Sequence, residues 1–257
     1  MKKSKLILIT GGTGLMGKGL EETAPAAYKI LSVHQRDYAV EDSRVKHLVL
    51  DIRNQRKVDA LFARRKFDAV IHAAGIASVD YVEKHYGESF ESNLLGTLNI
   101  TAACRRLDIP LIYISTNAVF DGTKPPYRES DPFNPLNKYG HIKVECEKLV
   151  RETLEYFTIV RPILMYGWNH HVCRPNPATW IYEKLLRGET VHLVDDVQEN
   201  PLYNLQCGQA LWEIIKRKPG GVFHLAGGEI VNRYEFARAL AKIFGLDKSL
   251  LVPVKSS

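Results

Sequence analysis

Several features are scarce or missing in this sequence of 257 residues, and each absence narrows the class of protein. Its four cysteines, Cys104, Cys146, Cys173 and Cys207, lie far apart and form no Cys-x-x-Cys pair, which argues against a zinc site or a disulfide framework. No apolar run approaches the roughly 20 residues that a membrane-spanning helix needs. The basic start, residues 1–5, precedes an apolar stretch too short for a signal peptide. We therefore expect a cytoplasmic protein with reduced thiols, no bound metal and no membrane partner.

Nucleic-acid binding is equally unsupported, because the sequence has no arginine-rich tract and no basic stripe interleaved with aromatic residues. The 35 basic and 29 acidic side chains give a net charge of +6 that is spread along the chain. An excess of this size suits an anionic small ligand. With 45% hydrophobic residues, the chain can bury a large core.

Short apolar runs alternate with segments of helical periodicity along the chain. The runs expected to form strands are residues 6–10, 30–33, 46–50, 69–72, 111–115, 158–161, 222–225 and, at the end of the chain, 251–257. The segments expected to form helices are residues 16–24, 55–66, 79–86, 88–107, 138–153, 177–187, 208–216 and 233–244. This alternation favours an α/β fold with a doubly wound, mostly parallel sheet.

The texture changes after Gly167, where loop-like segments and shorter helices indicate a small C-terminal cap. We expect a dinucleotide-binding Rossmann domain over residues 1–165 and a substrate-binding cap over 166–257. The two are partly interleaved, since residues 222–227 are expected to return to the sheet. Residues 191–197 are expected to form a loop.

A glycine-rich turn near the N-terminus, Gly11-Gly12-Thr13-Gly14-Leu15-Met16-Gly17, follows the first apolar run. Gly11, Gly14 and Gly17 let the backbone turn tightly and approach a ligand, and a helix can begin at Leu15. The free N–H groups at a helix N-terminus form a site for pyrophosphate. The spacing Gly-x-x-Gly-x-x-Gly departs from Gly-x-Gly-x-x-Gly, so a turn without a ligand stays an alternative.

Two further clusters carry proton chemistry. Ser115 and Thr116 end an expected strand, and Tyr139 and Lys143 lie one turn apart on one face of an expected helix. A free tyrosine has a pKa of about 10, and bringing it to 7 takes about 4 kcal/mol of preferential phenolate stabilisation. The ammonium of Lys143 and an oxidised nicotinamide are sources of that stabilisation. Thr116, or Ser115, would orient the substrate oxygen toward Tyr139; the alternative is a surface Tyr–Lys pair.

The end of the second expected strand bears on cofactor preference. An acidic residue there would hold the ribose 2′-OH of NAD, whereas this chain has His34 and Arg36, which can meet a 2′-phosphate. We therefore expect NADP to be preferred. NAD remains possible because Asp37 follows closely.

Together these clusters resemble the extended short-chain dehydrogenases/reductases that modify nucleotide sugars, above all the dTDP-4-dehydrorhamnose reductase family. The resemblance spans essentially the whole chain and rests on residues 11–17, 72–75, 93–97, 115–116, 121–122, 126–129, 135–143, 161–162, 166–167 and 223–227. It implies a reductase of a nucleotide-linked 4-keto-6-deoxy sugar, in dTDP-rhamnose or related carbohydrate biosynthesis. Thr116, Tyr139 and Lys143 would be its catalytic trio, with Tyr139 as the proton donor.

The resemblance also extends the cofactor site. It implies that Asp51 and Ile52 lie at the adenine, that Asn93 is a supporting helix residue and that Pro162 lies at the nicotinamide, while His72 is interpreted as structural. The complete expected cofactor set is Gly11, Thr13, Gly14, Leu15, Met16, Gly17, His34, Arg36, Asp51, Ile52, Ala73, Ala74, Gly75, Asn93, Ser115, Tyr139, Lys143 and Pro162. The expected substrate set is Thr116, Asn117, Val119, Tyr139, Leu164 and Trp168.

Departures from the family's pattern concern the sugar. Asn117 stands where these reductases tend to have aspartate, and Leu164 stands where they tend to have a pocket tryptophan. Trp168 would replace that tryptophan or pack against the cap. The lack of an acidic pair after Thr116 argues against the related 4,6-dehydratases.

The family further implies a homodimer formed through the helices expected over residues 88–107 and 138–153. Two alternatives to the reductase stay open. One is a nucleotide-sugar epimerase that uses tightly held NAD as a transient hydride store. The other is a non-catalytic subunit that resembles the methionine adenosyltransferase regulatory subunit.

Overall fold

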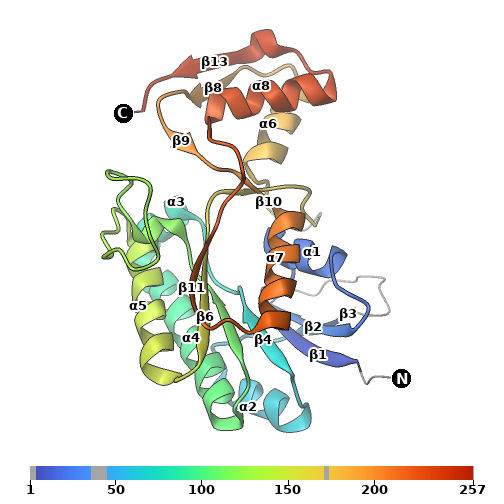
Figure 1. The fold of residues 1–257 in the computed structure, drawn as a ribbon. Coiled ribbons are helices and arrows are strands. Elements are labelled where there is room, and N and C mark those ends of the chain that lie inside the picture. The colour runs from blue at the N-terminus through green and yellow to red at the C-terminus, as the bar shows by residue number, and fades with distance from the viewer. Residues whose placement is uncertain (1–3, 36–44, 171–173, 257) are drawn as a thin grey trace.

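A parallel sheet of seven strands forms the centre of the computed structural model, which describes residues 4–35, 45–170 and 174–256 (Figure 1). The strand order is β11-β6-β5-β4-β1-β2-β3. These strands are β1 (Lys5–Thr10), β2 (Tyr28–His34), β3 (Val45–Val49), β4 (Ala69–His72), β5 (Leu111–Ile114), β6 (Phe157–Pro162) and β11 (Gly221–Leu225). The prediction of a doubly wound parallel sheet is confirmed, and each of its strands lies within two residues of its predicted bounds.

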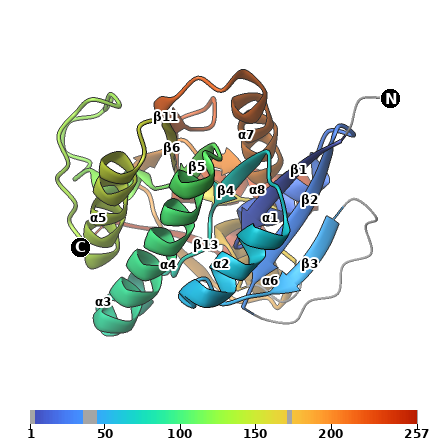
Figure 2. The same cartoon turned by 90° about the horizontal axis from the view of Figure 1, so that it is seen from below.

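Helices cover both faces of the sheet, because alternate residues of each buried strand point to opposite sides. Leu31 and Val33 of β2 belong to one core cluster and Ile30 to the other. The helices on the first face are α2 (Gln55–Arg64), α4 (Tyr86–Leu107) and α5 (Lys138–Thr153), which lie in a row (Figure 2). The helices on the second face are α1 (Leu15–Glu22) and α7 (Asn204–Arg217).

The cap stands above the carboxyl edge of the sheet and has its own apolar core (Figure 1). It is built mainly from α6 (Pro177–Leu186), β8 (Val191–Val194), α8 (Arg233–Phe244) and β13 (Leu251–Val254). The expectation of a loop over residues 191–197 is wrong for 191–194. Those residues form β8 because Val191 and Leu193 are buried in the cap core and the strand pairs in parallel with β13.

Two elements beyond residue 166 pack with the expected Rossmann domain and not with the cap. The strand β11 pairs with β6, and α7 packs on α1, where Trp212 Nε1 donates to the carbonyl of Leu20 at 3.0 Å. The interleaving is therefore larger than a return of residues 222–227. The remaining short elements are α3 (Val79–Lys84), β7 (Met165–Tyr166), β9 (Gln198–Glu199), β10 (Leu202–Tyr203), β12 (Val231–Asn232), η1 (Asn117–Val119) and η2 (Lys248–Leu250).

Within the described ranges, no helix combines the length and the apolar character needed to cross a membrane. Cys104, Cys146 and Cys207 are buried free thiols, and Cys173 lies outside the described residues.

Candidate active site

The glycine-rich turn connects β1 to α1 at the carboxyl edge of the sheet. Gly11 adopts a φ of +76°, and a Cβ there would lie 2.8 Å from the backbone of Ala74, so only glycine fits. The helix α1 begins at Leu15 without a side-chain cap on Gly14 and without an acidic residue in its first turn. Met16 is buried in the core, so it offers its backbone N–H. This arrangement fits the pyrophosphate of a dinucleotide.

The segment after β4 lies beside this turn and is held by hydrogen bonds. Thr10 accepts from the N–H groups of Ala73 and Ala74, at 3.2 Å through its carbonyl and 3.1 Å through its hydroxyl. Asn93 of α4 binds the backbone of Ile76 twice, accepting at 2.7 Å and donating at 3.1 Å. Residues 73–76, which include Gly75, are therefore held along the expected cofactor path.

His72 ends β4 and belongs to the framework. Its Nδ1 lies 2.6 Å from Thr10 Oγ1 and its Nε2 lies 3.1 Å from Thr97 Oγ1. Burial, reinforced by the charge of Lys143, lowers the pKa of His72 to about 3. The ring is thus neutral at physiological pH and joins β4 to β1 and α4, in agreement with its interpretation as structural.

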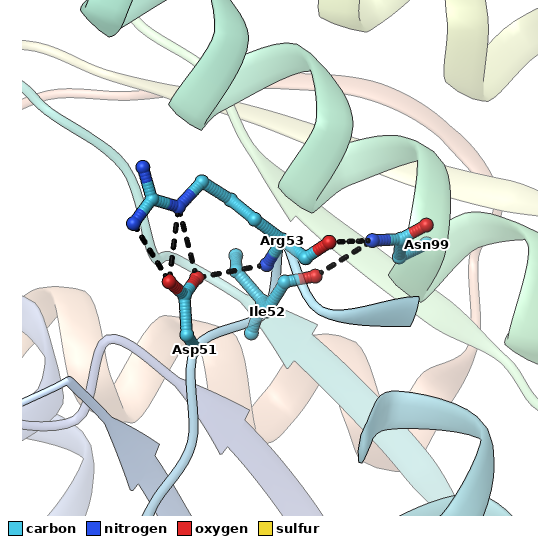
Figure 3. A network of polar contacts seen from close by, with 4 residues as sticks. All are labelled: Asp51, Ile52, Arg53 and Asn99. Carbon is cyan, nitrogen blue, oxygen red and sulfur yellow. Dashed lines mark hydrogen bonds and ion pairs between the residues drawn. The ribbon is translucent and has the colours of Figure 1, made fainter. Parts of the chain in front are cut away.

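At the end of β3, Asp51 and Ile52 form the edge expected to receive the adenine (Figure 3). Arg53 donates to the Asp51 carboxylate through its backbone N–H at 2.9 Å and Nη2 at 2.7 Å, which holds the pKa of Asp51 below its usual range. Asn99 Nδ2 donates to the carbonyls of Ile52 and Arg53 at 2.9 and 3.0 Å. Because the Ile52 side chain is buried against Gly96, Ile52 offers mainly its backbone here.

The residues expected to choose between NADP and NAD lie at the end of β2. His34 is buried, with its Nε2 3.2 Å from Nδ1 of His47 on β3, so its ring offers little surface to a phosphate. Arg36 and Asp37 lie outside the described residues.

Close to this site, a buried carboxylate lies near two imidazole rings. No local sequence pattern had indicated this cluster. Glu21 of α1 lies 3.8 Å from His47 Nε2 and 3.4 Å from His170 Nε2. Among the described residues no group of three His, Cys, Asp or Glu side chains is arranged to hold a metal ion. The contact joins α1 to the segment that leads into the cap.

The three expected catalytic residues come from η1 and α5. Thr116 caps the start of η1, where its Oγ1 accepts from the N–H of Ala118 at 3.1 Å. Asn137 begins α5 by accepting from the N–H of Gly140 at 2.8 Å. A Cβ on Gly140 would lie 2.2 Å from the Ala118 carbonyl oxygen, so glycine lets α5 approach η1. This approach brings Tyr139 against Thr116.

Of the two ionisable members of the trio, Lys143 is buried and Tyr139 is partly buried. Burial raises the pKa of the Tyr139 hydroxyl to about 12, whereas a hydrogen bond with Thr116 and the charge of Arg174 oppose the rise. Lys143 Nζ donates to the Ile114 carbonyl at 2.6 Å and lies 4.4 Å from the centre of the Tyr113 ring. Burial lowers the pKa of Lys143 to about 8.

These contacts add one residue to the expected site. The ammonium of Lys143 is directed to the carbonyl of Ile114, and its effect on the pKa of Tyr139 stays a prediction. A cation that does act on Tyr139 is Arg174, from the segment leading into α6, whose Nη2 also donates to the Ala77 carbonyl at 3.3 Å. In the sequence Arg174 lies in the loop-like stretch after Gly167, and no local signal connects it with Tyr139.

Ser115 and Pro162 lie at adjacent strand ends. Ser115 donates its N–H to the Val160 carbonyl at 2.7 Å, and its buried hydroxyl has no hydrogen-bond partner within the described chain. Pro162 ends β6 and is in register with Leu225 of β11. A buried hydroxyl at the sheet edge that lacks a protein partner is consistent with a hydrogen bond to a bound ligand.

Three further residues of the expected substrate set are Asn117, Leu164 and Val119. Asn117 is exposed on η1, and the Leu164 carbonyl accepts from Leu202 at 2.9 Å. Val119 is a correction: its side chain is fully buried with Phe120 and Val144, so it has no surface for a substrate.

Trp168 lies against the cap. Its ring meets Tyr182 edge-on at 5.5 Å and Phe244 at 5.9 Å, measured between ring centres. This matches the second of its two interpretations, packing against the cap, although half of the side chain remains exposed.

Comparison with known proteins adds four likenesses to this geometry. The family profile described as RmlD substrate binding domain matches residues 4–257. The crystal structure of dTDP-4-dehydrorhamnose reductase from Bacillus anthracis, in complex with NADP, superposes with a TM-score of 0.86 at 25% identity and covers 100% of this chain and 86% of that one.

Two curated relatives differ in the roles their names carry. Methionine adenosyltransferase 2 subunit beta of Xenopus laevis is 29% identical over 257 residues, which cover 98% of this chain and 75% of the relative. The spore coat polysaccharide biosynthesis protein SpsK of Bacillus subtilis is 28% identical over 250 residues, which cover 95% of this chain and 81% of the relative.

Proposed function

Since the chain belongs to the RmlD substrate binding domain family, we propose that it is an NAD(P)-dependent oxidoreductase of the short-chain dehydrogenase/reductase type that reduces a nucleotide-linked 4-keto-6-deoxy sugar. The observation that carries the proposal is the approach of α5 to η1, which puts Tyr139 and Thr116 together. They lie at the carboxyl edge of the same sheet as the glycine-rich turn, where open α/β sheets bind their ligands. The likeness to the B. anthracis enzyme supports the same reaction.

The protonation states suit reduction. With a pKa of about 12, the Tyr139 hydroxyl is protonated at neutral pH and can donate its proton to a carbonyl oxygen. Thr116 would hold that oxygen, so negative charge that develops on it is met by two hydroxyl groups. When bound, the reduced nicotinamide supplies the hydride that attacks the carbonyl carbon, and the products are the alcohol and the oxidised cofactor.

Residues on both sides of the trio would hold the cofactor and the sugar nucleotide. The turn over residues 11–17 and the start of α1 would receive the pyrophosphate, and Asp51 and Ile52 would border the adenine. Lys143 would hold the nicotinamide ribose. Arg174, whose charge acts on Tyr139, would bind an anionic group of the nucleotide sugar. NADP is proposed as the preferred cofactor on account of Arg36.

The test is turnover with a panel of dTDP-, GDP- and UDP-linked 4-keto sugars, followed by NADPH absorbance. We expect stoichiometric loss of NADPH with at least one sugar, and loss of that turnover in the Tyr139→Phe variant while NADPH still binds. No cofactor consumption with any sugar would argue against the reductase, and sugar interconversion without net consumption would indicate an epimerase.

A second candidate function has one observation in its favour, the likeness to methionine adenosyltransferase 2 subunit beta. In that case the chain would bind a catalytic partner and its role would not depend on the Tyr139 hydroxyl. Tyr139→Phe separates the two candidates, because a binding subunit would keep its effect on a partner enzyme.

The proposed enzyme is a homodimer that associates through α4 and α5. Leu95 and Leu98 of α4 are exposed apolar side chains three residues apart on one face of the helix, where a partner helix would cover them.

A further inference from the structure

Among the side chains that the described part of the molecule buries completely, the largest is a charged one, Arg161 of β6, which is 2% exposed. Its Nε and Nη2 donate to the two carboxylate oxygens of Glu147 on α5, each at 2.8 Å. This is the bidentate geometry of the strongest guanidinium–carboxylate pairs. Tyr139, Lys143 and Glu147 follow one another at intervals of four residues on α5. The Arg161–Glu147 ion pair therefore contacts the face of α5 that carries the proposed catalytic residues.

The other side of the guanidinium holds the excursion over residues 120–134. Arg161 Nη1 donates to the Glu129 carbonyl at 3.2 Å, and its guanidinium carbon lies 5.1 Å from the ring centres of both Phe120 and Phe133. These rings lie near the two ends of the excursion. The excursion begins directly after η1, which Thr116 caps, and it leads into α5.

A third contact ties the same excursion to the last strand of the sheet. The Glu129 carboxylate accepts from the N–H of His224 on β11 at 3.1 Å, and Arg161 Nη1 lies 3.4 Å from His224 Nε2. One buried cation therefore contacts β6, α5, β11 and the excursion that connects η1 to α5.

We propose that Arg161 is a positioning residue for the reaction: by holding Glu147 of α5 and the excursion over residues 120–134 together, it sets the separation between Thr116 and Tyr139. The inference rests on the proposed reductase function. A buried ion pair is a weak source of net stability, because removing two charges from water costs about as much as their attraction returns. Orientation, by contrast, is what a planar, bidentate and stacked guanidinium supplies.

The charge of Glu147 also reaches Lys143. Burial lowers the pKa of Lys143, and Glu147 and Cys146 oppose that effect. The other titratable groups that face Lys143 are the neutral His72 on β4 and Tyr113, whose ring centre lies 4.4 Å from Lys143 Nζ. Neutralising Glu147 is therefore expected to move the Lys143 titration toward acid pH, which a purely packing role would not do.

The first experiment compares Arg161→Lys with Arg151→Ala. Lysine keeps the charge but loses the bidentate and stacked geometry, and we expect kcat to fall about 10- to 100-fold while the KM for the cofactor changes less than about twofold. Arg151 lies 3.5 Å from the same Glu147 but is 36% exposed, so its variant should keep both constants. A folded Arg161→Lys protein with the kcat of the wild type would overturn the proposal.

A second variant changes a residue of the excursion over residues 120–134 and leaves the buried Arg161–Glu147 ion pair intact. Phe133→Leu removes one ring from the guanidinium, and we expect kcat to fall about tenfold without a change in cofactor KM. Unchanged kcat in this variant contradicts the proposal even where Arg161→Lys does not fold.

A readout that needs no turnover separates this inference from the proposed function. In full-length protein labelled with ¹³C-lysine, the Lys143 signal is assigned through Lys143→Arg and titrated in the wild type and in Glu147→Gln. We expect the midpoint to move to lower pH in Glu147→Gln, and an unmoved midpoint counts against the proposal. If the wild type reduces no keto sugar, the reductase assignment fails, whereas a moved midpoint still supports the link from Glu147 to Lys143.

Discussion

The α-carbon of Gly140 faces the carbonyl oxygen of Ala118 so closely that a methyl group on it would lie 2.2 Å from that oxygen. This contact joins the first turn of α5 to η1. Because Tyr139 precedes Gly140 and Thr116 caps η1, the same contact sets how the two proposed catalytic hydroxyls meet. Glycine at position 140 is thus required for the geometry of the site.

Gly140→Ala should separate these hydroxyls. Alanine cannot fit without moving backbone against backbone, so α5 must shift away from η1, and we expect kcat to fall about 100-fold. The matched control is Gly87→Ala in α4, where a Cβ would meet nothing within 4 Å and helix propensity improves by about 1 kcal/mol. Steady-state kinetics and thermal unfolding of both variants check the prediction, and equal activity in the two would contradict it.

The pH dependence of the reaction should report Lys143. The pKa of this ammonium is lowered from 10.5 to about 8, so kcat/KM is expected to fall as the pH rises through about 8. Tyr139, with a pKa of about 12, stays protonated over this range. Lys143→Arg, where it retains activity, should lose the alkaline limb because arginine stays charged. A wild-type profile that is flat to pH 10 would exclude Lys143 as the group responsible.

The same titration has a definite sign for stability. Between pH 8 and 10.5 the unfolded chain holds the Lys143 proton more firmly than the folded chain does, so the contribution of this group to stability rises with pH over that window. Chemical denaturation of the wild type and Lys143→Met at both ends of the window measures it. The variant should show a smaller rise.

Arg174→Ala should weaken binding of the nucleotide sugar. The guanidinium lies near Tyr139 and carries the charge that suits a diphosphate, so we expect the KM for the sugar nucleotide to rise about 10- to 100-fold while the KM for the cofactor is unchanged. Arg64→Ala, at the exposed end of α2, is the control. A matching rise in both variants would remove Arg174 from the substrate site.

Cofactor preference should depend on Arg36. Loss of its bidentate donors in Arg36→Ala is expected to raise the KM for NADPH at least about tenfold more than the KM for NADH. His34→Ala serves as the comparison, because the structure buries that ring against His47 and we expect little discrimination between the cofactors. Equal effects of Arg36→Ala on both KM values would argue that another group selects the cofactor.

The proposed dimer should separate when charge enters its apolar face. Leu98 on α4 is 40% exposed, and Leu98→Glu places a carboxylate where α4 would meet its counterpart. We expect sedimentation velocity to show a dimer for the wild type and a monomer for this variant. Ile243→Glu, on the exposed face of α8, should remain dimeric, and a wild type that sediments as a monomer would end the proposal.

What the sequence by itself determined is local. Period-two and period-3.6 patterns encode the strands and helices directly, and the bounds of α5 follow from Asn137, whose side chain caps the helix. The turn at Gly11 is equally local, because its φ of +76° favours glycine. The recognisable segments are therefore the ones that form the sheet edge and the proposed cofactor path.

Contacts between distant segments were decided by tertiary structure alone. Val119 lies in a recognisable motif, yet its side chain packs against Val144 and is buried in the core. Lys143 is directed to the carbonyl of Ile114, and Arg174, from a distant segment, acts on Tyr139. Which side chains a distant segment covers, and which distant charge lies opposite them, depend on how the whole chain packs. A pattern along one segment does not identify those partners.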